Sequence, residues 1–487
     1  MSTAATGTDH IGLRRVLGPA HVWALGVGIV LVGEFMGWNF TIDNGGPWAA
    51  LVACFVSGLL YTCVAMIDSE VTSTVAAAGG QYTQAKHIVG PLMAFNVGLY
   101  LVLAYTMLEA ADAIVVGDLM KSMAADFGAA SPEEADKLAR PFVTLSIMVL
   151  ALLNYRGVFM TLSVNFVITA FAFLAILLLL LNVGPWSGTH LLQHQAFFAN
   201  NSLPYGWLGV LASLQFGMWY YLGIEGTCQS AEEVRSPGRA IPLGTMTGML
   251  TLVIAAVITW YVCTGLIPWE YLGIAATPMY DAGKLTGSWN LQVLMWVGSA
   301  FAALASANGC INDASRAWFS MGRDRYLPAW FGAVHPTYHT PYRAIVFLVP
   351  IACAFGLTGY TQIQGQIMLN QVITFSILAG LLGYTFMPIN MIRFRRMWPL
   401  GTIDRGYVHP FHPIPTLTLG ALCALTFVAV SLGYGRNLLA IMAFFIVISV
   451  WFVVRRYQFV RRGDQFTMNW PRPIGYCSPV GQDPAGF

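Results

Sequence analysis

The sequence is poor in charge. Only 9% of its 487 residues are Asp, Glu, Lys or Arg, whereas 57% are hydrophobic, and an ordinary soluble domain carries about 25% charged residues. A soluble protein of this size needs a charged surface that this chain cannot supply, so we expect lipid to cover most of its exterior. The net charge of +2 gives no reason to expect a nucleic-acid partner.

The sequence also lacks the motifs that would indicate a cofactor, a metal site or an enzyme. Its eight cysteines contain no CxxC pair, and we interpret them as small core residues. His335 and His339 are four residues apart, but Pro336 and Pro341 disfavour the helix that would pair them, so we predict no metal. No metal triad or nucleophile motif appears, so we predict no enzymatic activity and no cofactor.

Apolar runs of span length recur along the chain, and they are continuous rather than alternating, which excludes a β-barrel. No cleavable leader precedes the first run, so we expect that span to be retained. We predict an all-α polytopic membrane protein with twelve transmembrane helices, at residues 21–44, 48–68, 91–118, 141–154, 162–183, 206–228, 244–267, 290–312, 342–358, 366–391, 413–433 and 437–454.

The basic residues predict the orientation of these spans. If the N-terminus is cytoplasmic, most of the 24 Lys and Arg lie on the cytoplasmic side. The opposite side then holds Lys121, Lys137, Arg140, Lys284 and Arg436. The positive-inside bias therefore predicts cytoplasmic N- and C-termini in a cell inner membrane. We expect a short helix after Ser131 in the external loop 119–140, and a long cytoplasmic loop at 313–341.

Two spans are interrupted by glycine next to an acid. The first reads GVGIVLVGEFMGWNFTIDNGGP at 26–47, with breaks expected at Gly33 and Gly37. The second reads FGMWYYLGIEGTCQS at 216–230, with breaks expected at Gly223 and Gly226. Unwound backbone at membrane depth is tolerated where it lines a cavity. Paired breaks in corresponding spans indicate an inverted-repeat transporter whose substrate binds where the helices unwind.

Four stretches carry a family resemblance: GGQYTQAKHIVGPLMAFNVG (79–98), LNYRGVFMTLSVN (153–165), EGTCQSAEEVRSPGRAIPLG (225–244) and SRAWFSMGRDRYLPAWFGAVH (315–335). On these motifs the chain resembles the amino acid–polyamine–organocation (APC) superfamily. The resemblance implies the leucine-transporter fold, a 5+5 inverted repeat plus two helices. The implied parts are a cytoplasmic segment (1–20), two repeats (21–183 and 206–391), spans 11 and 12 (413–454) and a cytoplasmic tail (455–487).

A shorter motif, GEFMGWNF at 33–40, is similar to the ethanolamine-permease-like branch of this superfamily. The resemblance further implies that Trp219 covers bound substrate and that Glu225 takes part in gating. Span 5 lacks the Lys that replaces sodium in some proton-coupled relatives, so the coupling ion stays open between a proton and sodium. Ser306 and Asn308 could contribute to a sodium site.

Charge within the spans indicates the cargo. Glu34, Glu109, Asp112 and Glu225 lie in apolar helices, and no Lys or Arg does. A buried carboxylate costs several kcal/mol unless it is paired, protonated or facing water, so the missing partner is a proton or a cationic substrate. Glu34 and Glu225 could instead bond freed backbone N–H groups, and Asp112 could be a solvated acid.

We therefore predict a secondary active transporter that imports a small amine or amino alcohol, ethanolamine-like, by alternating access. An amino-acid transporter or antiporter is the alternative, and a transporter-like membrane sensor is an alternative of another class. The expected partners are the cationic substrate and the lipid bilayer; the oligomeric state stays open. The predicted substrate-binding residues are Glu34, Gly37, Trp38, Asn39, Tyr105, Glu109, Trp219, Tyr220, Gly223 and Glu225.

Overall fold

A computed structural model describes residues 13–461, except 127, 129–130, 194–202, 359–361, 364–365 and 435–436. The N-terminal segment predicted at 1–20 and the tail predicted at 455–487 lie largely outside the described residues, as does Arg436.

The first predicted repeat is a broken helix followed by four long helices. Long apolar stretches form the four long helices, and the short α5 lies between the first and second of them. The elements are α1 (Pro19–Val30), α2 (Val32–Phe35), α3 (Phe40–Gly45), α4 (Pro47–Thr74), α5 (Gln81–Ile88), α6 (Pro91–Asp126), α7 (Pro132–Arg156) and α8 (Val158–Val183).

The second predicted repeat has the same order, beginning with a second broken helix. Its elements are α9 (Gly206–Gly217), η2 (Met218–Tyr220), η3 (Ile224–Cys228), η4 (Ala231–Glu233), α10 (Pro237–Leu266), α11 (Trp269–Leu272), α12 (Pro278–Leu285), α13 (Trp289–Arg323), η5 (Ala329–Gly332), α14 (Tyr342–Thr358), β1 (Gln362–Ile363), β2 (Gln366–Ile367), α15 (Met368–Thr385) and α16 (Met387–Met397). Two further helices follow, α17 (Ile414–Tyr434) and α18 (Asn437–Arg461).

The prediction of an all-α polytopic membrane protein is confirmed. Within the described ranges, nine helices are long and apolar enough to cross a membrane. The two broken segments, 19–45 and 206–228, and the shorter α14 complete the twelve expected spans. The β1–β2 hairpin is a two-residue pairing in a connection.

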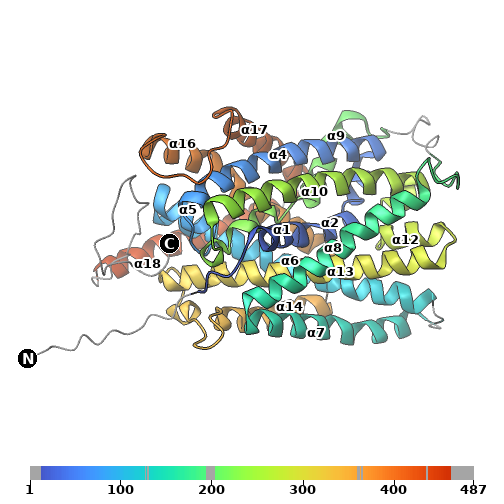
Figure 1. Ribbon diagram of the computed structural model, residues 1–487, viewed down its shortest axis with the longest axis horizontal. Coiled ribbons are helices and arrows are strands. Elements are labelled where there is room, and N and C mark those ends of the chain that lie inside the picture. The colour runs from blue at the N-terminus through green and yellow to red at the C-terminus, as the bar shows by residue number, and fades with distance from the viewer. Residues whose placement is uncertain are drawn as a thin grey trace, which may run out of the picture.

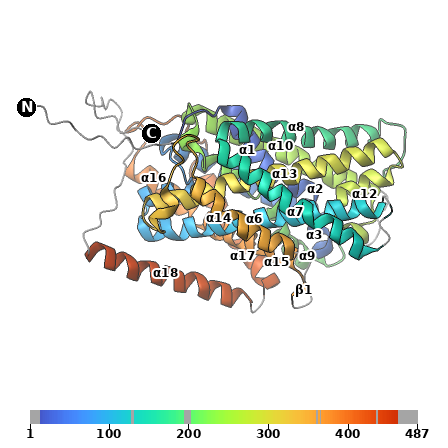
Figure 2. The same cartoon turned by 90° about the horizontal axis from the view of Figure 1, so that it is seen from below.

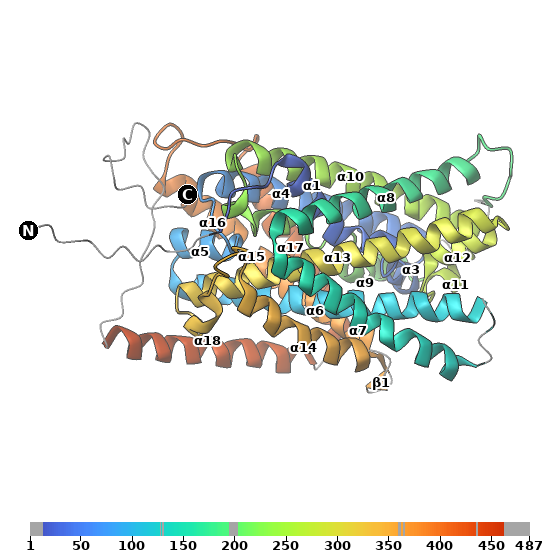
Figure 3. The ribbon, with the colours of Figure 1, turned by 60° about the horizontal axis from the view of Figure 1, so that its bottom comes forward.

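The helices that interrupt the two repeats lie at opposite ends of the bundle. In each repeat they follow the second span: α5 follows α4, and α11 and α12 follow α10. Figure 3 shows α5 and α16 at one end, here called the α5 end, and α11 and α12 at the other, called the α12 end. The same element on opposite sides is the arrangement expected of an inverted repeat. The repeat boundaries themselves stay a prediction.

The core of the bundle is built on α6 and α13, which run side by side (Figure 1). The most apolar window of α6 is 89% buried, whereas that of α18 is 11% buried. Figure 2 shows α18 along the outer edge of the bundle. Its exposed side chains are aliphatic or aromatic, such as Leu439, Ile446 and Val447, as expected of a helix whose solvent is lipid.

Two sequence-based boundaries are wrong. No separate short helix follows Ser131, because α7 begins at Pro132 and continues to Arg156. The expected loop at 313–341 begins too early, because α13 continues to Arg323. Asp313 and Arg316 therefore lie in a span helix, and the expectation that no base lies in a span is wrong.

An ion pair explains how α13 continues past these charges. The Arg316 guanidinium donates to both carboxylate oxygens of Glu233, from Nε at 2.9 Å and from Nη2 at 3.1 Å, and both side chains are fully buried. Arg316 Nη1 also donates to the Asn312 carbonyl at 3.1 Å. This pair ties the segment after the second break to α13 at the α5 end.

Glu233→Gln should strongly destabilise the protein, because it leaves a buried guanidinium without its counter-charge, at a cost of about 3–5 kcal/mol. The double variant Arg316→Met with Glu233→Leu should recover much of this loss. Thermal melting in detergent measures both, with Glu133→Gln in the exposed Glu133–Lys137 pair as an unaffected control. Equal losses in the single and double variants would contradict the interpretation.

Candidate functional site

The first break lies between α2 and α3. Helix α2 ends at Phe35 and α3 begins at Phe40. Between them Gly37 has a φ of 92°, a left-handed conformation that a residue without Cβ adopts at little cost. The Gly37 N–H donates to Asn39 Oδ1 at 3.0 Å. The break is therefore a local turn stabilised by its own side-chain amide.

The Asn39 amide also ties this break to the connection after α11. Asn39 Nδ2 donates to the Leu272 carbonyl at 2.7 Å and to the Ala275 carbonyl at 2.9 Å. Both amide hydrogens are thus used in this conformation. The substrate contact predicted for Asn39 would require these bonds to open, so we interpret Asn39 as holding the α12 end closed over the site.

The second break follows α9, which ends at Gly217. The chain continues through two short 3-10 turns, with Gly223 at a φ of 113° between them. Glu225 Oε2 accepts from the Gly223 N–H at 3.2 Å, and Glu225 Oε1 accepts from the Tyr105 hydroxyl at 3.2 Å. Glu225 thus holds the turn of the second break and joins it to α6.

Trp219 joins the two breaks. Its indole Nε1 donates to the Met36 carbonyl in the first break at 3.1 Å. A Cβ built on Gly33 would lie 2.6 Å from the Trp219 carbonyl oxygen, and a Cβ on Gly37 would overlap the indole ring. The absence of side chains at these glycines is what lets Trp219 approach the backbone of the first span.

A row of aromatic rings continues from this contact. Trp38 and Tyr220 have ring centroids 6.0 Å apart, Tyr220 and Tyr221 5.9 Å, Tyr221 and Tyr61 6.0 Å, and Tyr61 and Tyr384 5.3 Å. The row draws on both broken spans and on α4 and α15. Sequence analysis predicted its first two members, Trp38 and Tyr220.

Glu34 differs from Glu225 in having no hydrogen-bond partner among the described residues. Its side chain is fully buried, and neither carboxylate oxygen has a hydrogen-bond partner among the described residues. Cys54, Tyr220 and Tyr221 lie close enough to Glu34 to interact with it electrostatically. Glu34 is therefore the acid at the first break that still has capacity to bind a donor.

Glu109 and Asp112 lie on α6, which packs against α13 and α14. Both are fully buried, so the alternative that Asp112 is a solvated acid is wrong. Asp112 Oδ2 lies 3.9 Å from Cys310 Sγ on α13. The groups that interact with this pair include Cys310 of α13 and Cys353 of α14, whereas those that interact with Glu34 include Cys54, Tyr220 and Tyr221.

Sequence analysis missed Asp313. Its Oδ1 accepts from Asn312 Nδ2 at 2.9 Å, and a Cβ on Gly226 would overlap its Oδ2. A carboxylate of α13 therefore lies directly against the second break. One signal could have indicated it: Asp313 is seven residues from Ser306, which places both on the same helical face. The sequence instead predicted a loop that begins at Asp313.

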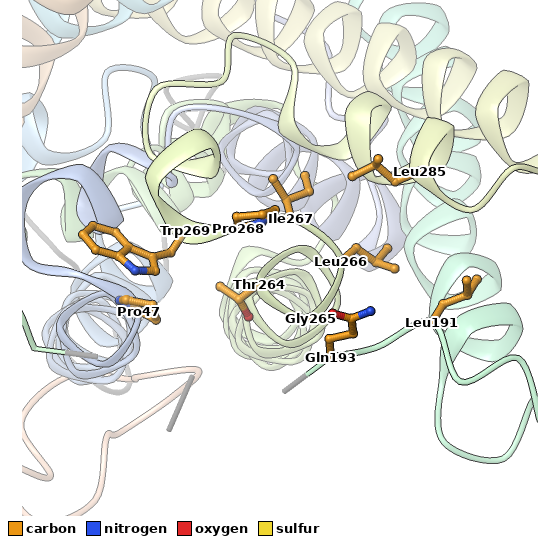
Figure 4. Close-up of a pocket in the computed structure, with 10 residues that line it drawn as sticks. All are labelled: Pro47, Leu191, Gln193, Thr264, Gly265, Leu266, Ile267, Pro268, Trp269 and Leu285. Atoms are coloured by element: carbon orange, nitrogen blue, oxygen red, sulfur yellow. The ribbon is translucent and has the colours of Figure 1, made fainter. Parts of the chain in front are cut away.

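The predicted site is enclosed. Its large side chains, from Glu34 to Glu225, expose at most 4% of their surface. A cavity of about 280 Å³ lies at the α12 end (Figure 4). No charged residue is among its lining residues, Pro47, Leu191, Gln193, Thr264, Gly265, Leu266, Ile267, Pro268, Trp269 and Leu285. This cavity can admit a solute, and its described lining offers no charged group to select for charge.

Comparisons with known proteins agree with this architecture. The amino acid permease family matches residues 20–462. An uncharacterized transporter of Rhizobium meliloti (strain 1021) is 65% identical over 98% of this chain and 99% of its own length. The methylthioribose transporter of Bacillus subtilis (strain 168) is 25% identical over 87% of this chain and 90% of its own length. A branched-chain amino acid permease of the same organism is 24% identical over 72% and 76%.

Gly37→Ala should destabilise the protein more than Gly401→Ala does. Gly401 has a similar φ of 86°, but nothing lies within 4 Å of its Cβ position. Both variants carry the backbone strain of about 1–2 kcal/mol, and only Gly37→Ala also displaces Trp219. Thermal melting in detergent compares them; equal shifts would show that the Trp219 contact contributes nothing.

Asn39→Ala should weaken binding of a plain alkylamine and of its hydroxylated analogue by the same factor, because the amide holds the Leu272 and Ala275 carbonyls. Thermal stabilisation by ethylamine and by ethanolamine measures the two affinities. A selective loss for ethanolamine would instead support a direct contact between Asn39 and the substrate hydroxyl, in line with the substrate-binding role predicted for Asn39.

Proposed function

The chain belongs to the amino acid permease family of transporters, and we propose that it imports a small amine or amino alcohol, an ethanolamine-like cation, by alternating access. The observation that carries this proposal is Glu34, a fully buried carboxylate with no partner in the described structure, at the first break. Burying such a carboxylate in its ionised form costs several kcal/mol unless it binds a proton or pairs with a cation. A substrate ammonium supplies both charge and donors.

The aromatic side chains beside Glu34 suit the same cargo. Trp38 and Tyr220 are both fully buried, and neither Trp38 Nε1 nor the Tyr220 hydroxyl has a partner within the described residues. Their rings can hold an ammonium by cation–π contact, worth about 0.5–2 kcal/mol. The Tyr220 hydroxyl is also free to bond the hydroxyl of an amino alcohol.

An amino-acid cargo needs a place for its carboxylate, and the first break offers a poor one. The Gly37 N–H, which could bind a carboxylate, is already bonded to Asn39 Oδ1. Glu34 lies three residues away and would repel an anion. A transporter or antiporter of cationic amino acids is the second candidate, because Glu34 could also bind a side-chain ammonium. The relatives are named for different substrates, namely methylthioribose, branched-chain amino acids and cationic amino acids. Family membership therefore leaves the choice of substrate open.

The distribution of charge supports an orientation. Lys86, Arg323 and Arg395 lie on elements of the α5 end, and Lys284 lies on α12 at the other. By the positive-inside bias, the α5 end faces the cytoplasm. The proposal therefore has both termini cytoplasmic in a bacterial inner membrane, with substrate entering at the α12 end.

Alternating access requires that the two ends of the bundle open one at a time, and polar contacts hold both ends closed in this structure. At the α12 end Asn39 binds the Leu272 carbonyl. At the α5 end Arg395 binds Glu70 with Nη2 2.6 Å from Oε2, in addition to the Arg316–Glu233 pair. The described conformation is thus closed on both sides of Glu34, and uptake would need the Asn39 tie to release first.

Ethanolamine and ethylamine should raise the melting temperature of the purified protein, and ethylene glycol should not, because only a cation neutralises Glu34. At 100 times the Kd, the stabilisation is about 2.7 kcal/mol. Glu34→Gln should remove the effect of both amines while the protein stays folded, and Glu270→Gln, an exposed acid on α11, should leave it unchanged.

Stabilisation by alanine or lysine but by neither amine would move the proposal to an amino-acid cargo. Amine binding that persists in Glu34→Gln would place the ammonium elsewhere. Uptake of labelled ethanolamine into proteoliposomes completes the test, since binding without flux would favour the membrane sensor.

A further inference from the structure

A second group of unsatisfied acids lies in the core, outside the substrate site proposed above. Glu109 and Asp112 are three residues apart on α6, hence on one face of the helix. Both are fully buried. Neither Glu109 oxygen has a hydrogen-bond partner in the part of the chain that the structure describes, and nor has Asp112 Oδ1.

The walls of this group come from α13 and α14. Cys310 of α13 lies 3.9 Å from Asp112, between Sγ and Oδ2. The Ser306 hydroxyl, one turn earlier on α13, lies beside Asp112, is fully buried and has no hydrogen-bond partner among the described residues. Cys353 of α14 is close enough to Glu109 to sense its charge. The ionisable groups around the two acids are therefore the thiols of Cys310 and Cys353, and Cys310 also lies near Asp313 on α13.

We propose that Glu109 and Asp112 together bind the coupling proton. Two carboxylates on one helical face and away from water cannot both be ionised at low cost, whereas one proton held between them removes the like-charge repulsion. Binding converts one carboxylate to a carboxylic acid, whose O–H donates to the other acid or to Ser306. This inference rests on the transport function proposed above.

The surroundings favour a proton over sodium. Hard cations prefer a shell of several oxygen ligands, and here α13 presents a single hydroxyl, that of Ser306, beside the sulfur of Cys310. The amide of Asn308, the other residue considered for a sodium site, is already used. Asn308 Oδ1 accepts from Asn154 at 2.8 Å, and its Nδ2 donates to the Thr161 carbonyl at 3.2 Å.

The pair is connected to the second break through α6. Tyr105 lies one turn before Glu109 on this helix and donates to Glu225 at 3.2 Å. Glu225 in turn accepts from the Gly223 N–H. Loss of the proton from the pair would change how α6 packs on α13. The Tyr105 side chain would then transmit this change to Glu225 and to the backbone at the second break.

Uptake of labelled ethanolamine into proteoliposomes, alkaline inside and with the membrane potential clamped at zero, tests the proposal. One proton per substrate allows about tenfold accumulation per pH unit. The isosteric variants Glu109→Gln and Asp112→Asn should lose this accumulation, to a ratio of about one, but keep substrate counterflow within about twofold. Asp126→Asn, at the far end of the same helix, should keep both activities, and protein-free liposomes give the passive background.

Two results would overturn the proton site. Accumulation that survives in Glu109→Gln and Asp112→Asn would show that the pair does not couple transport. Accumulation by the wild-type protein that depends on a sodium gradient and not on the pH gradient would show that the coupling ion is sodium. Loss of counterflow together with loss of thermal stabilisation by ethanolamine would place the pair in the substrate site instead.

A wild-type protein that neither binds nor carries ethanolamine would refute the proposed function, and a second measurement then tests the proton site alone. If the folded pair holds a proton that the unfolded chain releases, stability falls as the pH rises. The wild-type melting temperature should fall between about pH 5 and pH 9, and the double variant Glu109→Gln, Asp112→Asn should fall less. Equal slopes would overturn the proposal.

Discussion

The cost of holding a carboxylate away from water is the constraint on which this structure depends. Several of its buried acids are satisfied by groups within the chain, among them Glu233 by the Arg316 guanidinium, and Glu225 by a backbone N–H and a tyrosine hydroxyl. Glu34 and Glu109 have no such group among the described residues. A fold that satisfies some buried acids permanently and leaves others open can bind and release positive charge at the open ones.

The second constraint is the backbone of the two breaks, which must be satisfied at membrane depth. The breaks satisfy each other in part, because Trp219 of the second donates to the Met36 carbonyl of the first. This contact requires glycine at positions 33 and 37, where a side chain would meet Trp219. Gly37, which interrupts the helix, and Gly33, which lies within α2, therefore both provide the close approach that closes the site.

The positions of the spans and of the breaks were predictable because both signals are local. An apolar run of about 20 residues forms a transmembrane helix in lipid. Glycine weakens a helix wherever it occurs, so a glycine beside a polar residue marks a possible break. The end of α13 was not predictable in this way, because Arg316 reads as a loop residue until its partner Glu233 is known. The tyrosines at 61 and 384 were missed for a related reason: nothing local separates a ring in a site from a ring in the core.

The sequence by itself determined that this chain is a twelve-span membrane protein, where two of its helices break, and that acids are buried near the breaks. Only the tertiary structure decided which of those acids remain open. Asn39 and Leu272 are far apart in the chain, yet a hydrogen bond between them occupies the Asn39 amide in the described conformation. Hydrogen bonds act over about 3 Å and need alignment, so whether a buried polar atom is satisfied depends on packing between distant segments, which no local pattern encodes.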